Sequence, residues 1–407
     1  MTLQTALSGL LGAQTGLNTV SNDLANANTT AFKSQTALFQ DVFPANATDT
    51  PGIGTALEGI STDMTQGNLT STGNSLDAAI QGNGYFIVSN NGSQQYTRDG
   101  AFQLSSTGQM ETLNGQSLLG YTSTNGVLGS TLGPITINTG AVAANATTQI
   151  GATLDLNSGD TTIPSTTTFD PTDSSTYSES TSVVTYDSLG NANRVQLYLV
   201  QNQPATSGAT PSWTVYAQPQ LADGSAVGSP QNLTTLDFSS SGALTSGSPA
   251  TLNVNWGNGA AASSVAFNFS GTTLSAQDFA VAGITNDGFA PGSYTGSSIS
   301  ADGSIDATYS NGQTVSAGKI ALANFINPQG LTSITGNLYS ASSSSGEALV
   351  NTPGSGLAGS LSGGELESSN ASTSSLLVSL IQYQQAYQAN TSVIQTEQQD
   401  SQRLVQI

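Results

Sequence analysis

The first thirty residues of the chain carry apolar side chains at a helical spacing. The intervals between these side chains alternate between three and four residues without a break. Such spacing is typical of a coiled-coil seam and predicts a helix of about four heptads. The seam positions are Leu3, Ala6, Leu10, Ala13, Leu17, Val20, Leu24 and Ala27.

The other end of the chain repeats this pattern. Hydroxyl side chains at Ser372, Thr373 and Ser374 can cap a helix that begins there. We therefore predict a second helix and expect the two ends to pair. Its seam positions are Leu376, Leu380, Tyr383, Tyr387, Asn390 and Ile394, flanked by Leu377 and Ile381.

Neither predicted helix has the charged outer face that a solvated helix normally carries. Asp23 is the only charged side chain between residues 1 and 32, and none occurs between 368 and 396. One interpretation is a plain terminal hairpin of low charge. We favour a second, in which these faces also pack against other copies of the chain, where an unpaired charge is expensive to desolvate.

Between the two ends, short alternating segments and turn residues predict β structure. Residues 76–121 indicate a meander of short strands, with a turn at Asn114-Gly115. Residues 146–284 add alternating segments such as Val195, Leu197 and Leu199, which indicate a separate antiparallel β domain. Strand signals resume between 285 and 345.

The predicted fold is mainly β with helical ends: an N- and C-terminal α-helical coiled coil plus two nested antiparallel β domains. First and last segments pair, second and penultimate segments share a domain, and the middle is inserted. The predicted parts are a terminal coiled-coil domain (1–30 with 371–407), an irregular linker (31–70 with 341–370), an inner β domain (71–145 with 285–340) and an inserted outer β domain (146–284).

Charge and composition exclude several classes of function. The 407 residues include 25 acidic and five scattered basic ones, for a net charge of −20, which argues against nucleic acid and anionic membranes as partners. The chain has no Cys and no His, which removes the usual zinc sites, thiol nucleophiles and imidazole-dependent triads. No apolar run is long enough to insert into a membrane, and no cleavable secretory signal is expected.

No motif predicts catalytic, cofactor-binding or metal-binding residues. Gly82-Asn83-Gly84 lacks the third glycine of a dinucleotide loop, because Ile87 stands in its place, and a strand is predicted after it. The spacing of the acidic residues gives no calcium loop and singles out no carboxylate pair for hydrolysis. We predict a protein that is not an enzyme and has no cofactor.

Several segments, in order, resemble the axial proteins of the bacterial flagellum, the family of rod and hook subunits. The resemblance covers both ends and the inner β domain, with Ala31 where glycine is common, Ala371 where valine is usual and Gln385 where arginine is usual. The segments are NDLANANTTAFK (22–33), QGNLTSTGNSLDAAIQGNGYF (66–86), YTRDGAF (96–102), LANFINPQGL (322–331), GELESSNAS (364–372) and LIQYQQAYQAN (380–390).

This resemblance implies a structural role outside the cell. The insert at 146–284 resembles an addition found in hook rather than rod subunits. A hook subunit is implied to self-assemble into a flexible curved tube that transmits torque from rod to filament. Its implied partners are copies of itself, the rod and hook–filament junction proteins, the hook cap and the flagellar type III export apparatus.

We predict that the terminal segments form the self-assembly interface. Alternatives that remain open are a distal rod subunit of the same family and an extracellular Ser/Thr-rich adhesin; a cytosolic acidic hydrolase leaves both helical ends unexplained. The predicted interface residues are Leu3, Leu7, Leu10, Leu17, Leu24, Asn26, Asn28, Phe32, Leu376, Leu380, Tyr383, Tyr387, Asn390 and Ile394.

Overall fold

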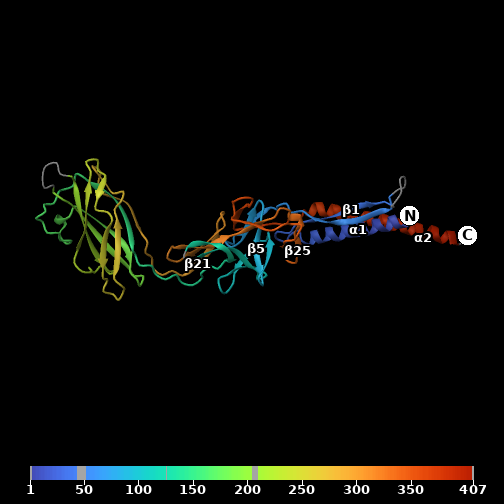
Figure 1. Ribbon diagram of the computed structural model, residues 1–407, viewed down its shortest axis with the longest axis horizontal. Helices are drawn as coiled ribbons and strands as arrows, with labels where there is room; N and C mark the ends of the chain where they lie inside the picture. Colours follow the sequence, from blue (N-terminus) through green and yellow to red (C-terminus); the bar gives the residue numbers. More distant parts are fainter. Residues whose placement is uncertain (1, 44–51, 125, 204–209, 406–407) are drawn as a thin grey trace. The chain divides into compact units, whose positions relative to one another are not determined.

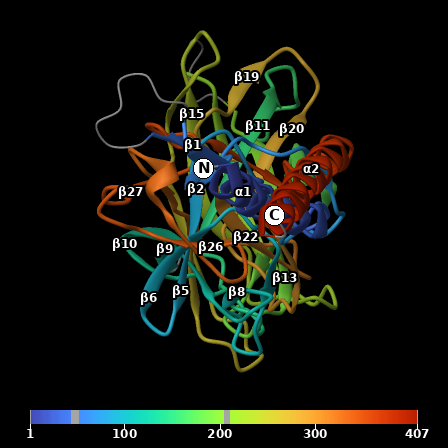
Figure 2. The same cartoon turned by 90° about the vertical axis from the view of Figure 1, so that its right-hand side faces the viewer.

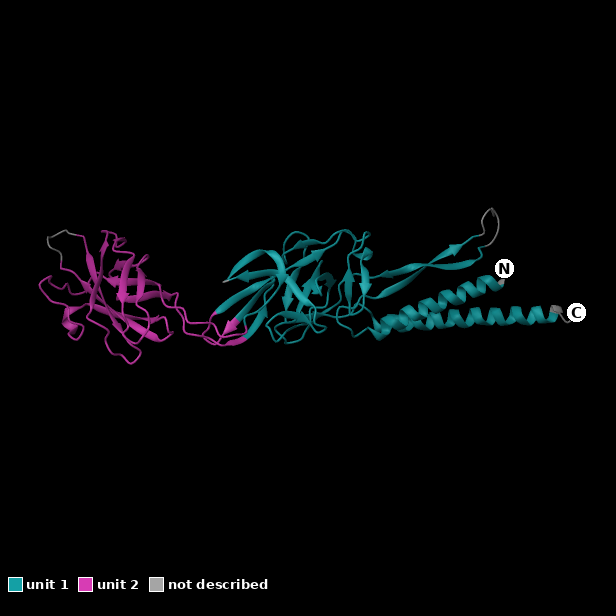
Figure 3. Cartoon of the chain, turned by 60° about the horizontal axis from the view of Figure 1, so that its bottom comes forward, with its two compact units in different colours: residues 1–138, 296–307, 314–407 teal, residues 139–295, 308–313 magenta. Residues whose placement is uncertain are grey.

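The computed structural model describes residues 2–43, 52–124, 126–203 and 210–405. The chain divides into two compact units (Figure 3). Unit 1 comprises residues 1–138, 296–307 and 314–407, and unit 2 comprises residues 139–295 and 308–313. Unit 2 is therefore inserted into unit 1 along the sequence, and the predicted insert 146–284 falls inside it.

Both ends of the chain are helical, as the apolar spacing predicted. Helix α1 spans Thr2–Ala25 and helix α2 spans Thr373–Val405. The helices pack side by side and run antiparallel, so the beginning of α1 and the end of α2 lie at the same end of the pair (Figure 1).

A β-hairpin lies along α1. Strands β1 (Gln35–Val42) and β2 (Gly54–Thr62) pair antiparallel, with a register shift between Leu38 and Phe39. Helix α1 lies between this hairpin and α2 (Figure 2). The prediction of an irregular segment over 31–70 is therefore wrong for these strands. Their apolar and polar residues alternate poorly because of the register shift, and their contacts with α1 support them. Residues 44–51 of that segment lie outside the described residues.

A sheet of 13 described strands, built on the predicted meander, belongs to unit 1 except for the first residues of one strand and the last residues of another, which are assigned to unit 2. Its order is β21-β22-β23-β9-β5-β6-β26-β25, with β10, β24, β27, β7 and β8 paired off this path. Gly115 has φ +80° in the turn between β8 and β9, which explains the Asn-Gly signal. The strands are β5 (Tyr85–Asn90), β6 (Ser93–Thr97), β7 (Phe102–Leu104), β8 (Met110–Thr112), β9 (Ser117–Thr124), β10 (Val127–Pro134), β21 (Tyr294–Ile299), β22 (Ser304–Tyr309), β23 (Thr314–Ile320), β24 (Leu322–Asn324), β25 (Thr332–Ile334), β26 (Leu338–Ser340) and β27 (Leu349–Asn351).

Two short antiparallel pairs join the second segment of the chain to the penultimate one. Strand β3 (Leu69–Ser71) pairs with β29 (Glu365–Glu367), and β4 (Ala78–Gln81) pairs with β28 (Ser360–Gly363). The prediction that 341–370 is irregular is wrong here too, because each of these strands is too short to show a clear alternation by itself. The pairs bring residue 367 close to the base of the helices.

Unit 2 contains two five-stranded sheets. One has the order β12-β13-β14-β15-β16 and is antiparallel throughout; the other has the order β17-β18-β11-β19, with β20 also paired to β11. The second sheet is mixed, since β11 runs parallel to β18 and β19, which departs from the predicted antiparallel pairing. The strands are β11 (Gln149–Asn157), β12 (Glu179–Tyr186), β13 (Ala192–Gln201), β14 (Ser212–Gln220), β15 (Gln231–Phe238), β16 (Leu244–Ser246), β17 (Ala250–Val254), β18 (Ser263–Asn268), β19 (Thr273–Ser275) and β20 (Ala280–Asn286).

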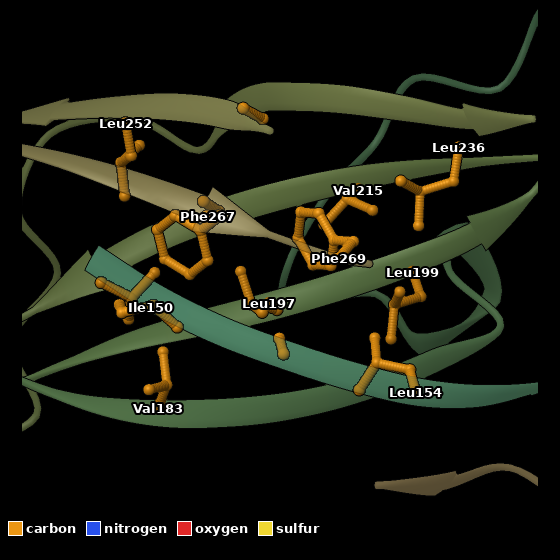
Figure 4. Packing of buried hydrophobic residues seen from close by; sticks show 14 of the residues in the cluster. Ile150, Leu154, Val183, Leu197, Leu199, Val215, Leu236, Leu252, Phe267 and Phe269 are labelled. Atoms are coloured by element: carbon orange, nitrogen blue, oxygen red, sulfur yellow. The ribbon is translucent and has the colours of Figure 1, made fainter. Parts of the chain in front are cut away.

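The core of unit 2 consists of inward-facing residues from both sheets (Figure 4). Val195, Leu197 and Leu199 on β13 are fully buried, which matches their predicted alternation. Both tryptophans of the chain, Trp213 and Trp256, belong to this core. Unit 2 therefore has a hydrophobic core of its own.

Candidate assembly surface

Two glycines let α1 and α2 approach closely. A Cβ atom at Gly16 would lie 2.3 Å from the ring of Tyr383, and one at Gly9 would lie 2.9 Å from the side-chain amide of Asn390. Both distances are shorter than real side chains tolerate, so any larger residue must displace its neighbour. The predicted interface residues Tyr383 and Asn390 thus contact α1 within the same chain.

The flank of α1 that faces the hairpin is also covered. Ser8 Oγ accepts a hydrogen bond from the backbone N–H of Thr55 at 3.2 Å, and the ring of Phe39 lies over Gly12. Ala6, Ala13 and Val20 are buried. These contacts occupy the small-residue side of α1 and leave its opposite side uncovered.

The structure places the predicted interface residues in three environments. Leu10, Leu17, Leu24, Leu376, Leu380, Tyr383, Asn390 and Ile394 are half-buried, Leu3, Leu7, Asn28 and Tyr387 are exposed, and Phe32 is buried. Asn26, also half-buried, donates through Nδ2 to the backbone oxygen of Asn22 at 3.0 Å, so it helps to end α1. The structure therefore brings the helical residues together within one chain and leaves some of their surface free.

Large apolar side chains remain exposed on both helices. On α1 the leucine stripe, Leu3, Leu7 and Leu11, repeats every four residues and is 45%, 49% and 55% exposed. On α2 the α2 patch consists of Leu377, Val378 and Ile381. Contiguous apolar surface of this kind on a soluble protein marks an interaction site. Leu11 and Val378 were missed from the sequence because they fall outside the strict seam spacing.

A buried ionic cluster holds the base of the helices to the β structure of unit 1. Glu367 is fully buried and pairs with Lys33 Nζ at 2.5 Å and with Arg98 NH1 at 3.1 Å. It also accepts a hydrogen bond from the backbone N–H of Gly67 at 2.9 Å. We call Glu367, Lys33 and Arg98 the Glu367 node. It joins three segments that are far apart in the sequence.

Backbone contacts reinforce this joint. Ala31 N donates to Glu367 O at 2.7 Å, and Ala31 has φ +57°, a conformation that suits glycine best. Asn370 Oδ1 accepts from Ser34 N at 2.8 Å, and Asn370 Nδ2 donates to Asp63 O at 2.9 Å.

The Glu367 node depends on all of its charges. Burial lowers the pKa of the Lys33 ammonium, and the hydrogen bond and charge of Glu367 raise it in part. A buried ion pair stabilises little relative to apolar residues, but removal of one partner leaves an uncompensated charge and destabilises strongly. One signal in the sequence could have indicated these residues: Lys33 and Arg98 are two of only five basic residues in the chain, and both lie within the motifs that resemble the family.

Asp23 is a buried carboxylate with incomplete hydrogen bonding. It is 1% exposed, its Oδ2 accepts from the backbone N–H of Gln35 at 2.9 Å, and its Oδ1 has no partner among the described residues. Burial raises the pKa of Asp23, although the hydrogen bond from Gln35 lowers it in part. Its place in the last turn of α1 also opposes the helix dipole.

We expect Asp23→Asn to stabilise unit 1 by about 1 kcal/mol at neutral pH, because a neutral amide keeps the bond to Gln35 without a buried charge. The pKa of Asp23 is higher in the folded protein than in the unfolded chain. The unsubstituted protein therefore loses folding stability as the pH rises from about 4 through the folded pKa of Asp23. The advantage of the variant should therefore vanish below about pH 4. Thermal unfolding followed by circular dichroism at several pH values checks this; an advantage that persists in acid contradicts it.

Gly16 and Gly12, two of the three glycines of α1, allow a matched comparison. We expect Gly16→Ala to destabilise the helix pair by about 1–3 kcal/mol, because its Cβ meets the Tyr383 ring. Gly12→Ala places its Cβ 3.5 Å from Phe39, an ordinary contact, so its helix propensity should stabilise by up to about 1 kcal/mol. Unfolding measured by circular dichroism at 222 nm compares the two variants, and equal effects would show that Gly16 is not a close contact.

The structure also bears on metal binding and on membrane insertion. Within residues 2–43, 52–124, 126–203 and 210–405, no group of three or more acidic side chains is arranged to hold a metal ion. In the same part of the chain, no helix combines the length and apolar character needed to cross a membrane.

Four family models match successive parts of the chain. They are described as flagella basal body rod protein (residues 3–33), flagellar hook protein FlgE/F/G D1 domain (79–153), flagellar basal body protein FlaE D2 domain (153–289) and flagellar basal body rod FlgEFG protein C-terminal (362–407). The insert, which carries no motif that we recognised in the sequence, has its own matching model.

Similarity extends over the whole chain. The flagellar hook protein FlgE of Salmonella typhimurium is 36% identical over 413 residues, with all of both chains covered, and that of Escherichia coli K12 is 36% identical over 422 residues with the same coverage. The chain belongs to the flagellar hook protein family. The resemblance inferred from the motifs is thereby confirmed, and the family is one of structural proteins.

The fold agrees with this membership. The crystal structure of the Helicobacter pylori flagellar hook protein FlgE2 is similar with a TM-score of 0.54 at 14% identity, over 72% of this chain and 98% of that one. Hook-family membership and the mainly β fold with helical ends, both predicted from the sequence, are thus confirmed. The family also places the chain in the bacterial flagellum.

Proposed function

We propose that this chain is a structural subunit of the flagellar hook and that its copies assemble into a helical tube. The observation that carries the proposal is the exposed leucine stripe on α1, in a chain that is 36% identical over its full length to hook proteins. Identical contacts between copies that do not close into a ring generate a helical filament. The role is structural, and we assign no catalytic one.

The leucine stripe and the α2 patch supply the apolar surface for these contacts. Within one chain, α1 packs on α2 and on the β1–β2 hairpin through its small residues. Its leucines then remain available for a neighbouring copy. The scarcity of charge on both helices favours this use, because few ionic groups need to be desolvated.

The Glu367 node fits a subunit that carries mechanical load. It ties the segment after α1, the strand β29 before α2, and Arg98 of the inner β region to one carboxylate. A twist applied to the helices would then pass to the β structure of unit 1 through charged hydrogen bonds and backbone contacts. We propose that torque passes from rod to filament by this route.

A hook lies between the rod and the filament, and this position implies further binding partners for the chain. We propose that the chain contacts rod proteins at one end of the tube, hook–filament junction proteins at the other, and a hook cap during growth. Passage through the flagellar export apparatus would precede assembly. The alternative of a distal rod subunit is less well supported, since relatives matched over their full length carry the hook name.

Electron microscopy of basal bodies from cells that lack this chain tests the proposal. A hook subunit predicts basal bodies with a complete rod and no curved tube beyond it. A rod subunit predicts a truncated rod, and an adhesin predicts unchanged basal bodies. Either of the last two results would refute the proposal.

A further inference from the structure

Unit 1 contains a cavity of about 210 Å³ next to the Glu367 node. Its lining includes Tyr85, Arg98 and Asn324 among residues of the β5 and β24 region. Tyr85 and Arg98 also contact each other, with the guanidinium carbon 5.5 Å from the centre of the ring. This cavity is separate from the leucine stripe and the α2 patch.

Two side chains that line the cavity each have a buried polar atom without a partner. Arg98 and Asn324 are 5% and 7% exposed, yet Arg98 Nε and Asn324 Oδ1 form no hydrogen bond with any described residue. The other groups of these side chains are engaged: Arg98 NH2 donates to Gly82 O at 2.6 Å and Asn324 Nδ2 donates to Leu357 O at 2.9 Å. A buried polar atom without a partner costs about 1–3 kcal/mol, so a group that supplies one is favoured.

Exposed apolar side chains are also part of the lining. Ile326 is 83% exposed, Leu357 is 70% exposed and Leu349 is 45% exposed. Three such side chains at one cavity form an apolar surface that a single chain leaves in water. A peptide segment with an aliphatic side chain would cover it.

Charge specifies the occupant further. Arg98 and Lys33 both pair with the carboxylate of Glu367, so two buried cations share one buried anion. The charge of Asp63 also acts on Lys33, but Asp63 is exposed. An occupant that brings a carbonyl or carboxylate oxygen would complement Arg98. This chain can itself supply carboxylate groups, since it has 25 acidic residues. On β2, for example, the acidic Glu58 and the aliphatic Ile60 are both exposed and lie two residues apart.

We propose that this cavity receives an aliphatic side chain, flanked by an acidic residue, from a second copy of this chain. The inference rests on the proposed assembly and adds a docking site in the β region to the helical contacts. A copy of the chain is favoured as the occupant because it is strongly acidic and supplies both chemical features. The contact would relieve the unpaired atoms of Arg98 and Asn324 and cover the exposed Ile326 and Leu357.

Single cysteines test this site, because the chain has none of its own. Leu357→Cys probes the cavity, and Leu113→Cys, at a residue that is also 70% exposed, is the control in the same unit. Thiol labelling should be fast at both positions in the monomer. In polymers of the purified chain it should slow by about tenfold or more at residue 357, and less at 113.

Equal labelling of polymer and monomer at residue 357, or equal protection at both positions, would overturn the proposal. Protection that occurs only in basal bodies isolated from cells would assign the cavity to another protein and also overturn it. Failure of the unmodified chain to polymerise would instead count against the proposed function, so the two failures are distinguishable.

Opposite charges at the cavity test the acidic nature of the occupant. Ile326→Glu should raise the critical concentration for polymerisation at low ionic strength by about tenfold relative to Ile326→Lys. Both substitutions lie at an 83% exposed position and should leave the monomer folded. Equal critical concentrations, or a higher one for the lysine variant, would contradict an acidic occupant.

Discussion

Replacing Glu367 with glutamine is expected to lower the free energy of unfolding of unit 1 by about 3–5 kcal/mol, because two buried cations lose the carboxylate that pairs with both of them. Lys33 and Arg98 are 2% and 5% exposed, so water cannot replace the carboxylate. The glutamine side chain has nearly the same shape, and the loss therefore measures charge rather than a cavity. The base of both helices should become the least stable part of unit 1.

The chain provides separate signals for its two units. Both tryptophans lie in the core of unit 2, whereas α1 and α2 belong to unit 1. In Glu367→Gln, the unfolding transition seen by circular dichroism at 222 nm should shift, while the one seen by tryptophan fluorescence should not.

Glu365→Gln is the matched control. Glu365 lies on the same strand, is half-buried and has no ion pair among the described residues. Its replacement should change stability by less than about 0.5 kcal/mol. A Glu367→Gln variant as stable as this control would show that the node does not hold the helices in place.

Leu7→Asp combined with Leu11→Asp is expected to abolish assembly while the monomer stays folded. Both leucines are about half exposed in the single chain, so the carboxylates remain hydrated and should change monomer stability by about 0.5 kcal/mol or less each. In a polymer that buries the leucine stripe, each unpaired carboxylate would cost several kcal/mol. Sedimentation and electron microscopy of the purified protein measure the result.

Leu113→Asp is the control for this variant. It introduces the same change at a residue that is 70% exposed in the turn between β8 and β9, outside both helices. This variant should form tubes. If the double variant also forms tubes with normal yield, the leucine stripe is not an interface between copies.

Much of the helical part could be predicted from the sequence. The spacing of apolar residues located both helices. That their uncharged faces pack against other copies of the chain stays a prediction. The predicted seam positions were less accurate. Gly9 and Gly16, which are not seam positions, contact α2, whereas the seam residue Leu3 is exposed. A seam rule selects large apolar residues, and it cannot find a close approach that depends on the lack of a side chain.

The β structure was predictable where turns were explicit. Asn114-Gly115 and the alternation around Val195 led to the correct strands. The β1–β2 hairpin was missed because α1 supports it and its register shift hides the alternation. Parallel pairing of β11 was missed because it depends on contacts between segments more than a hundred residues apart.

The Glu367 node could not be derived from local patterns. Its members lie at positions 33, 98 and 367, and a charged residue is normally expected at the surface. Only the fold, through the pairing of β29 with β3, brings them together. Family motifs mark all three segments, but a motif alone does not show which residues meet.

A nitroxide spin label on a single cysteine at position 7 tests the central claim, that the leucine stripe becomes buried between copies. Position 7 is 49% exposed in the single chain, and the label should be mobile in the monomer, with narrow spectral lines. In sedimented polymer the account predicts an immobilised label and broadening by labels on neighbouring copies. A label that stays as mobile in the polymer as in the monomer would contradict the account.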